Sequence, residues 1–204
     1  VSTIAYPAQR GPTPEPVEKL LAHFPFHFLQ RRNQSQRLHN ATMRIGVIGS
    51  SIAGASASLF LRRAGHSVTV LETVQRLKPL GAGFLLQPTG LRVLHELGLA
   101  EETIRAGAPI RALKGTTNTG RTVLDVHYER LESSLFGVGV GRGWLFSRLH
   151  EQLKDEGIEV RTGTHVSALG PSGSGGLVAK SEDGAHSTQL DGFDCVVVAT
   201  GSLN

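Results

Sequence analysis

The clearest chemical signal in the sequence is a glycine loop, Gly49-Ser50-Ser51-Ile52-Ala53-Gly54. In a strand–loop–helix unit, glycine at the first, third and sixth positions lets the backbone approach a pyrophosphate, which then sits on the amides of the helix N-terminus. The third position here is Ser51, whose Cβ points toward the phosphate position and whose hydroxyl can donate a hydrogen bond instead. The loop predicts a dinucleotide site with these contacts: Gly49, Ser51, Ile52, Ala53 and Gly54.

An acid, Glu72, follows the loop at the distance that such a site needs. A carboxylate about 20 residues after the glycine loop accepts hydrogen bonds from the ribose hydroxyls of a bound dinucleotide. It also disfavours a 2′-phosphate, so the expected ligand contains adenosine diphosphate without that group. An ordinary turn between two strands, with Glu72 in solvent, is the alternative interpretation.

The elements around the loop are those that must position it. Residues 44–48 form a short apolar run that predicts a buried strand, and residues 52–64 have the spacing of a helix that stops at Gly65. Residues 66–72 predict a second strand that ends on the acid. Strand, glycine turn, helix and strand within about 30 residues indicate a βαβ unit with parallel strands and a right-handed crossover.

The rest of the chain predicts an α/β protein with a parallel sheet and a β-meander. Residues 81–84 suggest a glycine-rich loop, and residues 164–190 a meander with turns at 171–173 and 183–184. The remaining patterns predict further helices over 88–97 and 144–156, and strands over 110–117, 121–128, 158–160 and 195–199.

Composition excludes several other classes of protein. Apolar residues make up 39% of the chain, enough to bury a core, and the lone Cys195 leaves no disulfide framework. No uncharged apolar run is long enough to span a membrane. The net charge of +4 lies mostly in residues 1–42, so the rest offers no basic patch for nucleic acid. Neither a metal-ligand spacing nor a nucleophile motif is visible, and no catalytic or metal-binding residue is predicted.

Residues 1–42 differ in composition from the rest of the chain. They hold five of the nine prolines and show no sustained period. We expect a disordered tail or an extension upstream of the true start at Met43; an organelle transit peptide is the alternative, because the segment is rich in Arg and poor in acids. If residues 1–42 are not a targeting segment, we expect the protein to lie in the cytoplasm.

From Met43 to Asn204 the chain resembles the N-terminal part of the FAD-dependent aromatic-ring monooxygenases, the group that includes p-hydroxybenzoate hydroxylase and salicylate hydroxylase. The resemblance is carried by the glycine loop with Glu72, by Gly81-Ala82-Gly83-Phe84-Leu85-Leu86-Gln87-Pro88, and by Arg142-Gly143-Trp144-Leu145. It implies a Rossmann-like, glutathione-reductase-type domain that binds FAD. It also implies that Gly83 lies close to the flavin, that Arg142 contacts the cofactor, that NAD(P)H is the reductant and that the substrate is a small aromatic molecule.

The resemblance also shapes the expected domain organisation. We expect residues 43–204 to form the FAD-binding domain, with residues 108–140 as part of a substrate-domain insertion. The family strand at 194–199 usually runs into Gly-Ala-Asp-Gly, whereas this chain has Val198-Ala199-Thr200-Gly201 and no Asp. The family continues past this point, so a domain truncated at its C-terminus, unable to hydroxylate alone, is expected. Alternatives are a non-catalytic FAD-binding fragment and another flavoprotein of the same fold, such as a reductase or halogenase.

Overall fold

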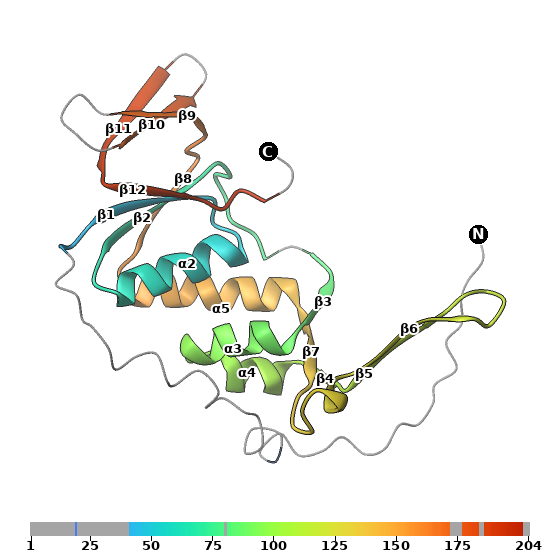
Figure 1. Cartoon of the computed structure of the whole chain (residues 1–204). Coiled ribbons are helices and arrows are strands. Elements are labelled where there is room, and N and C mark those ends of the chain that lie inside the picture. Colours follow the sequence, from blue (N-terminus) through green and yellow to red (C-terminus); the bar gives the residue numbers. More distant parts are fainter. Residues whose placement is uncertain (1–18, 20–40, 80, 172–176, 184–185, 202–204) are drawn as a thin grey trace.

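The computed structural model describes residues 19, 41–79, 81–171, 177–183 and 186–201. Its centre is a parallel sheet in the order β12-β1-β2-β8 (Figure 1). The strands are β1 (Arg44–Ile48), β2 (Ser67–Glu72), β8 (Glu159–Thr162) and β12 (Cys195–Val198). Helix α2 (Ile52–Arg63) joins β1 to β2, which pair in parallel, so the predicted βαβ unit is confirmed.

Strand β1 shows how the sheet is covered on both faces. Ile45 and Val47 belong to the core shared with the helices, which lie on one face of the sheet. Ile48 packs with Phe193 on the other face, next to the antiparallel meander. A Cβ on Gly46 would lie 3.3 Å from the Phe193 ring, so the glycine makes room for that ring.

Helix α5 (Arg142–Asp155) packs against α2 and starts two residues earlier than predicted. It ends in a Schellman motif, in which Gly157 N–H donates to Lys154 O and Ile158 N–H to Leu153 O. The predicted strand over 158–160 therefore has different bounds in the structure. The buried Ile158 belongs to the end of the helix, and β8 begins one residue later, at Glu159.

A second layer lies beyond α5. It contains α3 (Pro88–Glu96), α4 (Ala100–Ala106) and an antiparallel sheet ordered β3-β7-β4. These strands are β3 (Gly83–Leu86), β7 (Gly137–Gly141) and β4 (Ala108–Ile110). Their core contains five buried side chains: Leu91, Ile104, Phe136, Val138 and Val140.

The sequence prediction was wrong about part of this layer. Gly83 and Phe84 do not lie in a loop: they begin β3, in which Gly83 pairs with Gly141 of β7. Strand β7 itself was missed because glycine alternates with valine along it, and glycine has low strand propensity. The alternation of period two was nevertheless present in the sequence.

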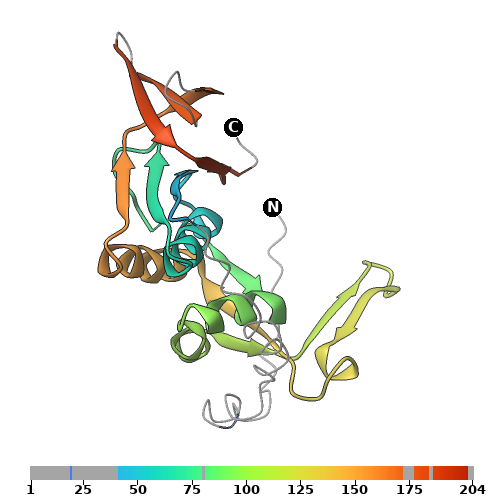
Figure 2. The same ribbon diagram turned by 60° about the vertical axis from the view of Figure 1, so that its left-hand side comes forward.

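A two-stranded hairpin projects away from the helices (Figures 1 and 2). It consists of β5 (Ala112–Thr116) and β6 (Thr122–His127), as predicted, and is followed by a 3-10 helix η2 (Tyr128–Arg130). Val123 is 59% exposed and Leu124 is 43% exposed. The hairpin therefore leaves apolar side chains uncovered within the described part of the chain.

The predicted meander is confirmed as an antiparallel sheet ordered β11-β10-β9. Its strands are β9 (Val166–Pro171), β10 (Leu177–Asp183) and β11 (His186–Phe193). Positions 172–173 and 184 of the predicted turns lie outside the described residues, as does nearly all of the predicted N-terminal extension over 1–42. Within the described ranges, no helix is long and apolar enough to cross a membrane, and no metal-binding cluster occurs.

Candidate functional site

The glycine loop, the end of β2 and the end of β12 meet at one edge of the parallel sheet. Gly49 N–H donates to Leu71 O at 2.8 Å, and Ala199 N–H donates to Ile48 O at 2.7 Å. Parallel strands bring their carboxyl ends to a common edge, which is where open α/β sheets bind ligands. Among the described residues, no group of side chains at this edge could hold a metal ion.

The first and sixth loop positions require glycine because a side chain at either position would collide with the backbone. Gly49 has φ of +98°, and a Cβ there would lie 2.6 Å from Ala199 O. A Cβ on Gly54 would overlap Gly49 O. The two glycines thus let the loop turn tightly between β1 and α2 while the end of β12 packs against it.

The third loop position, Ser51, is the N-cap residue of α2. Its hydroxyl donates to Ala199 O at 3.3 Å, so the Ser51 side chain is directed to the end of β12. Among the residues that the structure describes, no side chain caps the start of α2. The first amides of a helix have no partner within it, and those of Ile52 and Ala53 can therefore donate to an anion. Ile52 is half-buried, and Ala53 is exposed.

Glu72 lies beside the loop and holds it. Its Oε2 accepts a hydrogen bond from Ser50 N–H at 2.7 Å, and its Oε1 accepts one from Val74 N–H at 2.9 Å. A carboxylate has about four lone-pair sites, so Glu72 retains capacity for two further donors. The residue can bind hydroxyl groups while it fixes the position of the loop, a second role that spacing alone did not predict.

A further contact to the loop comes from α5. His150 Nε2 lies 2.8 Å from Ser50 O and 3.1 Å from Ser50 Oγ. Sequence reasoning gave His150 no role, because nothing in the sequence relates it to a residue 100 positions earlier. The contact follows only from the packing of α5 against α2.

Gly83 and Arg142 lie together at the start of α5. Gly83 pairs with Gly141, and Arg142 N–H donates to Ala82 O at 3.3 Å. A Cβ on Gly81 would lie 2.9 Å from Arg142 Cδ, so the exposed Arg142 side chain crosses that glycine. Arg142 precedes His150 by two helical turns, or about 12 Å along the axis. Gly83 and Arg142 therefore lie well away along α5 from the histidine that contacts the glycine loop.

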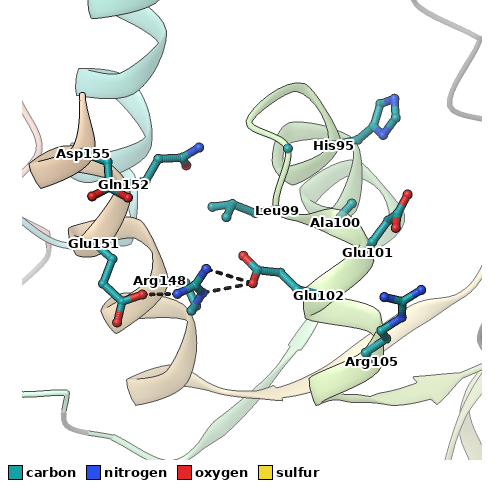
Figure 3. Close-up of a pocket in the computed structure, with 11 residues that line it drawn as sticks. His95, Leu99, Ala100, Glu101, Glu102, Arg105, Arg148, Glu151, Gln152 and Asp155 are labelled. Atoms are coloured by element: carbon teal, nitrogen blue, oxygen red, sulfur yellow. Dashed lines mark hydrogen bonds and ion pairs between the residues drawn. The ribbon is translucent and has the colours of Figure 1, made fainter.

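A separate pocket of about 560 Å³ lies between α4 and the C-terminal half of α5 (Figure 3). Arg148 lies between two carboxylates, bonding to Glu102 at 3.0 Å and to Glu151. The hydrogen bond that Arg148 donates to the Glu102 carboxylate raises the pKa of Arg148. Gln152 donates to Leu97 O at 2.8 Å. Three charged groups that line this pocket, Arg148, Glu102 and Glu151, thus already bind one another.

Comparison with known proteins shows the family of this chain. Residues 42–190 match the family described as FAD binding domain. The chain belongs to this family. Its cofactor is FAD, and the predicted Rossmann-like fold with a parallel sheet and antiparallel strands is confirmed.

Relatives of this FAD-binding domain are monooxygenases. It is 40% identical over 72 residues to 3-amino-4-hydroxybenzoate 2-monooxygenase of Streptomyces cremeus, across 35% of this chain and 18% of the relative. It is 28% identical over 169 residues to asperlicin C monooxygenase of Petromyces alliaceus, across 80% of this chain and 35% of the relative. The chain therefore spans well under half the length of these relatives.

The fold is shared with a solved structure, 2-methyl-3-hydroxypyridine-5-carboxylic acid oxygenase. The two superpose with a TM-score of 0.65 at 23% identity, over 79% of this chain and 40% of the other. The residues at the loop edge also fit FAD chemically. An uncapped helix start suits a diphosphate, and a carboxylate with free lone pairs suits ribose hydroxyls.

Proposed function

We propose that this chain is the FAD-binding part of an NAD(P)H-dependent monooxygenase that acts on a small aromatic substrate. The observation that carries the proposal is the sheet edge where the glycine loop, the uncapped start of α2 and Glu72 meet. When bound and reduced by NAD(P)H, the flavin supplies activation of dioxygen for insertion of one oxygen atom. Relatives named for oxidising aromatic compounds support the substrate class.

The loop and Glu72 take the adenosine diphosphate half of the cofactor in this proposal. Amides of Ile52 and Ala53 donate to the diphosphate, while the Ser51 hydroxyl, at the position where many such loops have glycine, donates to Ala199 O. Gly49 and Gly54 keep the loop tight against the strands. Glu72 accepts hydrogen bonds from the ribose hydroxyls with the lone pairs that the amides of Ser50 and Val74 leave free.

Gly83 and Arg142 take the flavin half. Both are exposed at the junction of β3, β7 and α5, and glycine at position 83 lets a planar ring approach the backbone. Arg142 presents a cation at the start of a helix, where the helix dipole does not favour one. A ligand that carries negative charge offsets that cost.

The proposal assigns residues 108–140 to the substrate side. The hairpin of β5 and β6 exposes Leu124 and Val126, two residues apart on one face, which suit a wall that excludes water from a substrate. The proposal also includes a cytoplasmic location, which the single cysteine of these 204 residues supports because no disulfide can form within them.

Flavin titration of the purified chain tests the proposal. Addition of FAD should change the fluorescence of the flavin saturably, and FMN, which lacks the adenosine half, should bind more weakly. Absence of FAD binding would contradict the proposal. NADH or NADPH is then added with 4-hydroxybenzoate or salicylate, and both flavin reduction and hydroxylated product are measured. A bound flavin that neither nucleotide reduces favours the non-catalytic alternative.

A further inference from the structure

His150 holds the carbonyl group of the second loop residue. Ser50 O can only accept a hydrogen bond, so His150 Nε2, 2.8 Å away, carries the proton that it donates. Ser50 Oγ lies 3.1 Å from the same nitrogen and accepts a second, weaker hydrogen bond from the same N–H. Ser50 is only 1% exposed, so this contact is shielded from water.

The His150 ring is itself fixed. It stacks on Phe146, one helical turn earlier, with ring centroids 4.0 Å apart and planes inclined by 30°. The ring therefore presents Nε2 to the loop in one orientation. Because α5 is anchored in the core through Leu145, Leu149 and Leu153, the histidine is a rigid donor rather than a mobile surface side chain.

This contact determines where the next amide points. The carbonyl of Ser50 and the N–H of Ser51 belong to one planar trans peptide, in which the two groups point in opposite directions. Holding the carbonyl toward α5 directs the Ser51 N–H away from α5. Glu72 fixes the preceding peptide through Ser50 N–H, so Ser50 is held from both sides.

We propose that His150 is a positioning residue that aims the Ser51 amide at the diphosphate of the bound cofactor, an inference that rests on the proposed function. His150 touches neither cofactor nor substrate in this proposal. It acts through the Ser50–Ser51 peptide, and what it contributes is the Nε2–H donor.

A pair of nearly isosteric variants tests the donor directly. His150→Met removes it, whereas His150→Gln replaces it with an amide N–H. We expect His150→Met to weaken binding of both FAD and free ADP about tenfold, the effect of one lost hydrogen bond. His150→Gln should stay within about threefold of the original chain. Calorimetry measures both ligands, and Gln152→Met on another face of the same helix is the matched control.

Each outcome is informative. Equal affinities for His150→Met and the original chain overturn the inference, and so does a His150→Gln variant as weak as His150→Met. Nitrogen-15 NMR of labelled histidine gives an independent check, because a His150 proton on Nδ1 instead of Nε2 also overturns it. If the original chain binds neither FAD nor ADP, the proposed function itself fails.

Discussion

Opposite faces of helix α5 meet two polar regions that differ in whether their groups already have partners. His150 faces the glycine loop, where the start of α2 has no side-chain cap among the described residues. Arg148 and Glu151 face the pocket toward α4, where the arginine is bound between two carboxylates (Figure 3). The backbone donors at the loop therefore make it a better candidate for an anion site than the cavity, whose arginine is already paired.

The largest expected effect comes from adding one methyl group to the loop. Gly49→Ala places a Cβ 2.6 Å from Ala199 O at a positive φ, so the loop must move and its amides lose their alignment. Losing two or more hydrogen bonds to a charged diphosphate should weaken FAD binding by about a hundredfold or more. Titration of FAD by flavin fluorescence measures the change.

A glycine at the far end of the same helix provides the control. Gly65 also has a positive φ, of +96°, but a Cβ there would meet nothing within 4 Å. Gly65→Ala should therefore lower the melting temperature while FAD affinity stays unchanged. Similar losses of affinity in both variants would mean that the loop has no special role and that backbone strain alone impairs the domain.

The positions of these glycines were predictable because the βαβ unit is local. Strand, turn, helix and acid lie within 30 residues, and each has its own pattern of apolar and glycine residues. The hydrogen bond from His150 to Ser50 joins residues 100 positions apart. Neither a histidine nor a serine in the sequence indicates which distant residue it will contact. The pairing of β3 with β7 was likewise unpredictable, since glycine obscures the strand pattern and the partner lies about 50 residues away.

A smaller effect is expected from Glu72→Gln. The amide has one acceptor oxygen, so it can accept from only one of the backbone N–H groups of Ser50 and Val74, and its NH₂ faces the other. We expect about a tenfold loss of FAD affinity, from the misplaced loop and the weaker acceptor for ribose. Glu159→Gln on neighbouring β8 should leave affinity unchanged, because Glu159 bonds to Arg161 instead. An unaltered affinity for Glu72→Gln would remove the acid from the site.

The smallest effect is expected on the other face of α5. Arg148→Ala breaks the ion pairs with Glu102 and Glu151, but the arginine side chain is 38% exposed, so water replaces much of what is lost. Exposed ion pairs contribute less than about 1 kcal/mol, and the melting temperature should fall by only a few degrees. FAD affinity should stay the same, because Arg148 points away from the loop that His150 holds. A tenfold loss of FAD affinity in Arg148→Ala would show that changes in the charged pocket alter the loop through α5. The two faces of the helix would then not be independent.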